Sequence, residues 1–415
     1  MSLLYLLLYL KIACFSTVID VTFFIRNDRI KSVVNCFILR RNLDMFQKIM
    51  SFLKKEIVLT ISGILAVISC FFVLPDSEYM GYIDFHTILI LFCLMAVMEG
   101  LKDIGLFQRI GETLLAKFHS ERGIAIVLVF LCFISSMFIT NDVALITFVP
   151  LALLIMTMAR MEEALCMIIT LMTIAANLGS MLTPIGNPQN LYLYSTSGMS
   201  LISFLKLMLP YTLTAAVLLL ISIYAKYHSK EISFELPVRR NILNKKRIAY
   251  YLVLFLLCLL AVAKVMPISI LFVIVFIAVF IDKRGLLKKI DYSLLATFIF
   301  FFIFIGNMGR LTLFRDFLTS ILEGNEMLVA IISSQVISNV PAALLLSGFT
   351  DKWTALIVGT NLGGLGTLIA SMASLISYKQ LAANYPEKKG KYMVMFTVWN
   401  IIFLIILYGV AMIMS

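Results

Sequence analysis

Long apolar segments separated by short polar loops run along most of the chain. Residues 57–74, 211–225, 250–263 and 393–414 are clear examples. A helix of about 20 predominantly apolar residues spans about 30 Å of hydrocarbon, and segments approaching that length recur here. The pattern predicts an all-α polytopic membrane protein, because a helix satisfies its backbone hydrogen bonds within one segment.

The composition points the same way. Of 415 residues, 61% are hydrophobic and 14% are charged, whereas a soluble chain is about half apolar and about a quarter charged. The excess apolar surface must face a lipid bilayer, so we expect a multi-pass protein of the cytoplasmic membrane without a sizeable soluble domain. The seven cysteines form no CxxC pair and the three histidines lie far apart, so no metal centre is predicted from them.

The net charge of +11 comes from basic residues gathered in short loops. Loops 101–122, 227–247, 282–292 and 379–391 are the basic ones. The positive-inside rule places them in the cytoplasm and the C-terminus outside. No nucleic-acid partner is therefore expected. Residues 1–49 are an uncertain N-terminal extension, either an extra helix or a segment before a true start at Met50.

An internal repeat is visible in the polar motifs. SSMFITN at 135–141 has a counterpart in SSQVISN at 333–339, and NLGS at 177–180 has one in NLGG at 361–364. The matches occur in the same order. We therefore predict a first repeat over 50–226, a cytoplasmic linker loop with a linking helix over 227–264, and a second repeat over 265–415. The linking helix would invert the second repeat in the membrane.

Each repeat is predicted to contain a re-entrant hairpin and a broken transmembrane helix. Apolar arms at 123–139 and 143–159 meet at a polar tip at 140–142, and the second tip lies at 338–340. Glycine and proline permit helix breaks at 176–188 and 359–367. The alternative is that both arms of each hairpin cross the membrane and the tips lie in aqueous loops.

Polar residues at these tips and breaks are the candidate binding residues, because polar groups at membrane depth are costly and usually functional. A helix that ends offers carbonyl oxygens to a cation, and a helix that begins offers N–H groups to an anion. The alternatives are helix capping and a packing notch of small residues. The candidates are Ser136, Thr140, Asn141, Asp142, Asn177, Ser334, Ser338, Asn339, Asn361 and Thr367.

Asp142 is the acid most deeply set in apolar sequence. A charged carboxylate at membrane depth needs a bound cation or a proton to neutralise it. The coupling ion is therefore predicted to be H⁺ or Na⁺, and no other cofactor is expected. The alternative is that Asp142 only caps its helix.

These residues resemble the ion transporter superfamily, in its citrate-transporter-like, divalent-anion:sodium symporter and arsenite permease branches. The resemblance covers roughly 54–414 and rests on TNDVALITFVP, SNVPAA, NLGS and NLGGLGTLIAS. It implies two re-entrant hairpins and two unwound helices around one central site, often in a homodimer. It also implies Na⁺ at Ser136, Thr140 and Asn141 near Gly179, and at Ser334, Ser338 and Asn339 near Gly363. The third tip residue is Asp142 in the first repeat and Val340 in the second, where the sodium-coupled branch has threonine. The acidic first tip is more similar to the arsenite permease and sodium/proton antiporter branches.

The sequence thus predicts a secondary active transporter that moves a small anion, such as a carboxylate or an oxyanion. An arsenite or antimonite efflux permease and a Na⁺/H⁺ antiporter remain alternatives. An ion channel or an intramembrane enzyme is the alternative from another class. No HExxH or Walker A motif occurs, so neither a zinc protease nor ATP-driven transport is expected.

Overall fold

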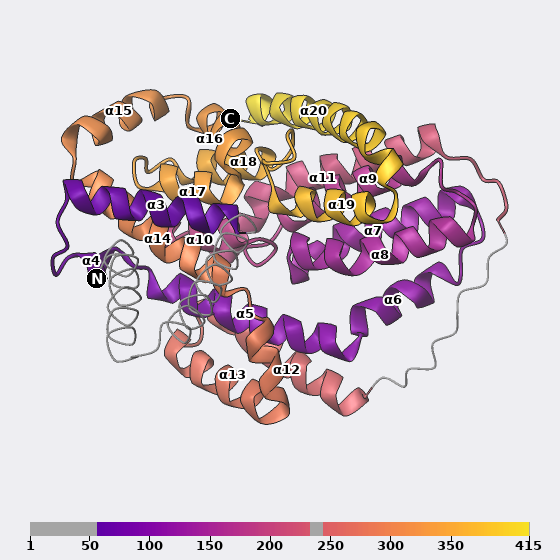
Figure 1. Ribbon diagram of the computed structural model, residues 1–415, viewed down its shortest axis with the longest axis horizontal. Coiled ribbons are helices and arrows are strands. Elements are labelled where there is room, and N and C mark those ends of the chain that lie inside the picture. Colours follow the sequence, from indigo (N-terminus) through magenta and orange to yellow (C-terminus); the bar gives the residue numbers. More distant parts are fainter. Residues whose placement is uncertain (1–55, 233–243, 415) are drawn as a thin grey trace, which may run out of the picture. The chain divides into compact units, whose positions relative to one another are not determined.

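The computed structural model describes residues 56–232 and 244–414 (Figure 1). The predicted extension 1–49 and part of the predicted linker, 233–243, lie outside the described residues. Within those limits the protein is helical and contains no β-strand. The all-α fold class predicted from the sequence is confirmed.

The chain divides into two compact units. The first comprises the described residues up to Ile83 together with Tyr292–Thr312, and the second comprises Asp84–Asp291 and Leu313–Ser415. The first unit contains α3 (Ile57–Phe72), α4 (Tyr79–Tyr82) and α14 (Tyr292–Gly309). Every predicted binding residue belongs to the second unit.

In the first unit α14 packs against α3. The Asn307 amide donates to Ser69 Oγ at 2.9 Å and to Tyr79 Oη at 2.8 Å, which ties the end of α14 to both shorter helices. Beyond α14, Arg310 pairs with Asp76 at 2.6 Å. This hydrogen bond from the guanidinium lowers the pKa of the Asp76 carboxyl.

The helices of the second unit alternate between long segments and short pieces. Its first half contains α5 (Phe85–Ile104), α6 (Leu106–Leu115), α7 (Glu121–Ile139), α8 (Asn141–Met158), α9 (Leu165–Ser180), α10 (Pro188–Ser197) and α11 (Leu201–Lys226). Next come α12 (Lys245–Val262), α13 (Ile268–Lys283) and the 3₁₀ helix η1 (Arg284–Lys289). After the first unit's α14 come α15 (Thr312–Leu322), α16 (Glu326–Ile337), α17 (Asn339–Ser347), α18 (Trp353–Leu362), α19 (Met372–Asn384), η2 (Pro386–Lys388) and α20 (Lys389–Met414).

Several helices have the length and apolar character of membrane spans. Among the described residues these are α7, α8, α11, α14 and the segment Pro386–Met414. The pair α15 and α16 would qualify as a further span but is bent by 111°. Helices such as α11 and α13 expose rows of large apolar side chains, including Leu213, Val217 and Ile277. Such rows explain why the composition is so apolar, since these faces suit contact with lipid.

Helix lengths differ between the two predicted hairpins. At about 1.5 Å per residue, α16 with 12 residues and α17 with 9 are each far shorter than the roughly 30 Å of hydrocarbon. Neither can cross the membrane alone. By contrast, α7 with 19 residues and α8 with 18 are long enough to do so. The re-entrant and inverted arrangement of the two repeats therefore stays a prediction.

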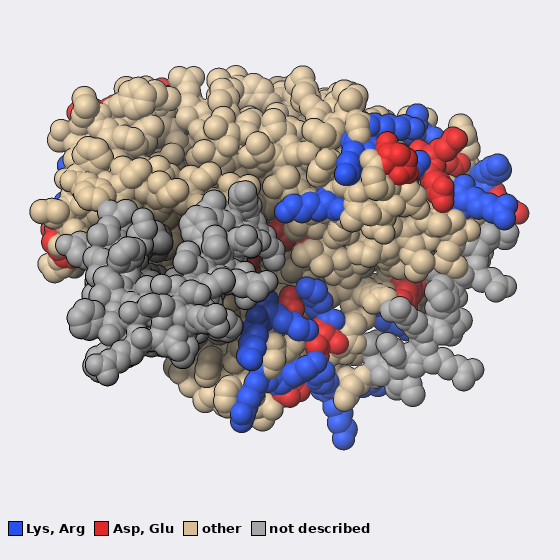
Figure 2. All heavy atoms as spheres, in the orientation of Figure 1, with Lys and Arg blue, Asp and Glu red and all other residues tan. Residues whose placement is uncertain are grey.

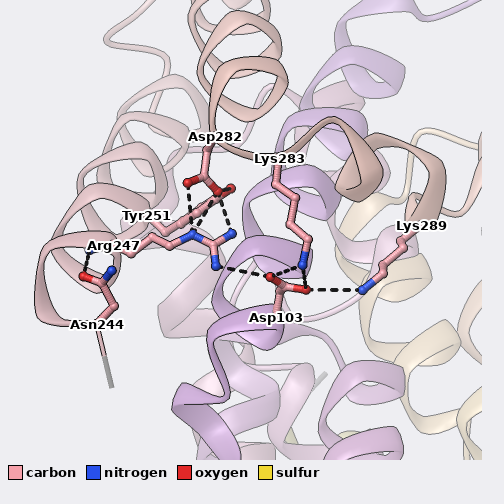
Figure 3. A network of polar contacts seen from close by, with 7 residues as sticks. All are labelled: Asp103, Asn244, Arg247, Tyr251, Asp282, Lys283 and Lys289. Atoms are coloured by element: carbon pink, nitrogen blue, oxygen red, sulfur yellow. Dashed lines mark hydrogen bonds and ion pairs between the residues drawn. The ribbon is translucent and has the colours of Figure 1, made fainter. Parts of the chain in front are cut away.

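Charged residues at one end of the second unit tie three predicted cytoplasmic loops together (Figure 3). Asp103, at the end of α5, pairs with Arg247 at 3.3 Å, with Lys283 at 2.8 Å and with Lys289 at 3.4 Å. Arg247 also pairs with Asp282 at 2.6 Å. Figure 2 shows basic side chains gathered over these ends of α12 and α13. The network places the three loops at the same end, as their shared basic character predicts.

Candidate functional site

The two predicted tips have the same unusual backbone. Thr140 separates α7 from α8 with φ 60° and ψ 148°, and Ser338 separates α16 from α17 with φ 74° and ψ 154°. Residues other than glycine rarely adopt positive φ, and such strain concentrates at functional sites. At both tips the next residue begins a helix, and its backbone N–H reaches the following broken segment. Asn141 N donates to Gly186 O at 3.2 Å and Asn339 N to Ala370 O at 2.9 Å.

The serine one turn before each tip packs closely against a glycine. A Cβ on Gly179 would lie 2.6 Å from Ser136 Oγ, and one on Gly363 would lie 2.5 Å from Ser334 Oγ. Both positions therefore require glycine. Each serine hydroxyl donates to a carbonyl of its own helix, which leaves its oxygen lone pairs unused by those bonds.

A third pair of contacts is duplicated. Thr183 Oγ1 donates to the carbonyl of Met137, and Thr367 Oγ1 donates to the carbonyl of Gln335 at 3.2 Å. Thr367 is exposed at this position. Corresponding residues of the two sequence motifs therefore make corresponding contacts, although the inversion between the repeats stays a prediction.

The first helix break is shorter than the sequence suggested, and the second lies four residues later along the chain than predicted. The helix α9 ends at Ser180 and α10 begins at Pro188, so the first break covers 181–187 against the predicted 176–188. The second runs from 363 to 371, between α18 and α19, against the predicted 359–367. Asn177 and Asn361 consequently lie in the last turns of helices, where their backbones are regular and their side chains carry the contacts.

Asn177 joins the first tip to the second repeat. Its Oδ1 accepts hydrogen bonds from Asn141 Nδ2 and from Ser371 Oγ, both at 3.0 Å. Its Nδ2 makes longer contacts of 3.4 Å to Gly364 O and 3.5 Å to Ser374 Oγ. Asn177 is 4% exposed, so these partners satisfy an amide that would otherwise be costly to bury.

A second amide cluster links the two breaks. Asn187 Nδ2 donates to Asn361 Oδ1 and to Ser180 Oγ, both at 3.2 Å. Asn361 Nδ2 donates in turn to Asn190 Oδ1 at 2.5 Å, and Asn190 Nδ2 reaches backbone carbonyls of the first break, the nearest being Met181 O at 3.3 Å. The predicted break at 176–188 includes Asn187, but sequence reasoning named neither Asn187 nor Asn190 as a binding residue, although the polar run Asn-Pro-Gln-Asn at 187–190 was a visible signal.

Four helix beginnings meet through these contacts. The start of α8 lies beside the start of α10, because Asn141 N bonds Gly186 O. The start of α17 lies beside that of α19 through Ala370. Asn177 connects the two pairs by accepting from Asn141 and from Ser371, the N-cap residue of α19. Each helix beginning carries partial positive charge, which favours an anion, although the first N–H groups of α8 and α17 are already bonded to carbonyls.

Asp142 is the acidic group of the first tip. It is half-buried, and its Oδ1 has no hydrogen-bond partner among the described residues. Its position in the first turn of α8 is favourable for a negative charge. A buried carboxylate oxygen without a donor is costly unless a cation or a proton joins it.

A pocket of about 560 Å³ opens along the same face of α8. Ile146, Pro150 and Leu154 line it, and they follow Asp142 at intervals of one helical turn. Lys102 and Glu112 line its other side. Asp142 itself is not among the lining residues, so the pocket ends about one helical turn short of its carboxylate.

Gln335, which the sequence analysis also missed, fills the second break. Its Nε2 donates to Gly363 O at 2.9 Å and to Leu365 O at 2.8 Å, and its Oε1 accepts from Thr367 N at 2.9 Å. A glutamine within the SSQVISN motif gave no sign of this role, because only the fold brings it against residues 363–367.

Comparison with known proteins identifies the family. The sequence profile of the citrate transporter family matches residues 44–351. The chain belongs to this family. The transporter is also 33% identical over 342 residues to an uncharacterized transporter of Methanocaldococcus jannaschii, which covers 82% of this chain and 92% of the relative. It is 31% identical over 316 residues to an inner membrane protein of Escherichia coli, covering 75% and 84% respectively.

A more distant relative is a silicon efflux transporter of Oryza sativa, 31% identical over 159 residues, or 38% of this chain and 32% of that protein. The resemblance to the ion transporter superfamily is therefore confirmed. The transporter is a multi-pass membrane permease for a small molecule or an ion, and it is not an enzyme.

Proposed function

We propose that the transporter moves a small anion, a carboxylate or an oxyanion, across the cytoplasmic membrane in a step coupled to H⁺ or Na⁺. The observation that carries this proposal is the meeting of four helix beginnings around the Asn177 network. The partial positive charge of the helix beginnings and the asparagine amides suit an anion that carries several oxygen atoms. The candidate residues named from the sequence would form the substrate and ion sites around it.

Asp142 supports the coupling part of the proposal. An anion binds poorly beside a charged carboxylate, so a cation or a proton must neutralise Asp142 first. The coupling ion would therefore bind before the substrate. Its route would be the pocket along α8, which Lys102 and Glu112 line on one side and Ile146, four residues after Asp142, on the other.

A second candidate is efflux of a neutral hydroxylated metalloid in exchange for protons. Two observations favour it: the carboxylate in the first tip, which suits a proton or a neutral hydroxyl donor, and the silicon efflux transporter among the relatives. A Na⁺/H⁺ antiporter would use the same carboxylate without an anionic substrate.

A panel of uptake assays in proteoliposomes tests the proposal. Citrate, succinate, sulfate, arsenite and silicic acid would be offered with an imposed Na⁺ or H⁺ gradient. The proposal predicts saturable uptake of a carboxylate or an oxyanion that accelerates with one of the gradients. Gradient-driven movement of arsenite or silicic acid alone would favour the second candidate, and ohmic current without saturation would indicate a channel and overturn both.

A further inference from the structure

The two repeats share the backbone of their tips but differ in the side chains around them. In the second repeat Gln335 Nε2 donates to two backbone carbonyls of the break, Gly363 O and Leu365 O, while its Oε1 accepts from Thr367 N. This pattern fixes the orientation of the amide. Rotating it by half a turn would place its oxygen against two carbonyl oxygens and its NH₂ group against an N–H.

The corresponding residue of the first repeat is Met137. Met137 and Gln335 occupy the same position in SSMFITN and SSQVISN, and each accepts the hydroxyl of its threonine counterpart through its backbone carbonyl. Both side chains are half-buried. A thioether has no hydrogen to donate, so Met137 cannot bond the carbonyls of its own break as Gln335 does. The amide that approaches the first-break carbonyls is Asn190 Nδ2, and it does so only at 3.3 to 3.5 Å, against 2.8 and 2.9 Å for Gln335 Nε2.

A second difference accompanies the first. Gly366 has φ +108°, and a Cβ there would lie 2.3 Å from Gln335 Oε1. The corresponding residue of the first repeat is Leu182. The glycine therefore makes room for the glutamine in the second repeat, and both special residues are absent from the first.

We propose that the Gln335 amide takes the place of a cation at the second tip, so that one coupling ion, bound at the first tip beside Asp142, drives each transport cycle. This inference rests on the proposed cation-coupled transport. A hard cation at a helix break is held by carbonyl and hydroxyl oxygens. At the second tip two of those carbonyls already bind the partially positive NH₂ group, and a cation would have to displace it.

The charge balance of the two tips agrees with this assignment. The first tip carries the carboxylate of Asp142, whereas the residue after Asn339 is the uncharged Val340. A cation at the second tip would therefore have no opposite charge on the tip itself. At the second tip the Gln335 amide already satisfies two carbonyl groups, and no charge on the tip needs an ion to balance it.

Thermal unfolding of the purified transporter tests the inference without requiring a known substrate. The midpoint would be measured while NaCl replaces choline chloride at constant ionic strength and fixed pH, and again while pH is varied at fixed Na⁺. Binding to the folded state raises the midpoint by mass action, and at saturating concentrations the free energy of unfolding rises with the logarithm of ion concentration by RT for each ion bound. We expect wild type to follow a single-ion curve for the ion that stabilises it.

Gln335→Glu provides the matched variant. Its carboxylate would face Gly363 O and Leu365 O with no proton to donate, so it should need a cation or a proton there. We expect a lower midpoint in choline at neutral pH and an added second phase of stabilisation by Na⁺ or by acid. Asn384→Asp, at an exposed residue at the end of α19 whose amide bonds only the Gln380 carbonyl of its own helix among the described residues, should leave the cation dependence at one ion.

Two results would overturn the inference: cooperative two-ion stabilisation of wild type, or a Gln335→Glu protein whose cation dependence equals that of wild type. If Gln335→Glu does not fold, the wild-type titration alone still decides between one ion and two. Transport measurements distinguish a failure of the proposed function from a failure of the role given to Gln335. Proteoliposome uptake that ignores both gradients would remove cation coupling itself, whereas gradient-driven uptake with two cations per cycle would remove only the role given to Gln335.

Discussion

Replacing Asn177 with alanine tests whether one side chain joins the first tip to the second repeat. The change removes the acceptor for Asn141 Nδ2 and for Ser371 Oγ, both at 3.0 Å. At about 1 kcal/mol of net stability per hydrogen bond, these two bonds contribute about 2 kcal/mol. The contacts of 3.4 and 3.5 Å made by Asn177 Nδ2 are too long to add much.

The coupling free energy between Asn177 and Asn141, measured in a double-mutant cycle, tests their contact more specifically than the stability of either single variant. Polar contacts between helices in membrane proteins average roughly 0.6 kcal/mol in double-mutant cycles and reach about 1.7 kcal/mol. The short, buried Asn141–Asn177 bond should lie in the upper half of that range, at about 1 kcal/mol. The two single variants and the double variant would be unfolded by titration with SDS in mixed micelles.

Asn400 supplies the control, since it is a fully buried asparagine of α20 whose amide bonds only its own helix, at Phe396 O. Asn141→Ala and Asn400→Ala should be additive within about 0.5 kcal/mol. A coupling between Asn177 and Asn141 no larger than this control value would show that the network does not hold the tip, and the reasoning from its geometry would fail.

Two further predictions concern the charge of the tip and the sidedness of the loops. Asp142→Asn keeps the shape and removes the charge, so substrate exchange should persist while gradient-driven accumulation is lost; Asp316→Asn, at an exposed acid of α15, should accumulate substrate normally. Full gradient-driven uptake by Asp142→Asn would mean that this aspartate only caps α8. Cysteines placed at Gly285 and Gly81, where added side chains meet nothing within 4 Å, should label oppositely with an impermeant maleimide in intact cells, because positive loops face the cytoplasm. Gly81 lies in segment 75–85, which carries acidic and no basic residues and is expected outside. Gly81→Cys should label and Gly285→Cys should not, and labelling of Gly285→Cys would reverse the predicted topology.

The fold class was accessible from the sequence because its cause is simple. Apolar segments of membrane length separated by basic loops allow little besides a bundle of helices. The bend of 111° between α15 and α16 was not foreseen. It lies at Gly324, whose φ of +76° is a local feature, but a glycine between two apolar stretches is common and does not indicate a bend by itself.

The motif repeat located the tips because a polar residue that occurs at the same position in both repeats is rarely there by chance. It could not find Asn187, Asn190 or Gln335, since these side chains differ between the repeats and act through contacts made only in the folded chain. Gln335, for example, lies 28 residues before Gly363, whose carbonyl it binds. A search for shared residues therefore finds what the two tips have in common and misses what distinguishes them.

The central claim is that the two tips act together as one transport site. It is tested most directly by gradient-driven uptake in proteoliposomes for Asn141→Ala and Asn339→Ala at matched protein levels, with Asn400→Ala as the buried control. Each tip variant loses the side-chain amide of a first helical residue, and at about 1 kcal/mol per hydrogen bond a folded membrane protein tolerates the cost. The account predicts that both tip variants reach the membrane and lose uptake while Asn400→Ala retains it. Uptake at the wild-type rate by either tip variant would contradict it.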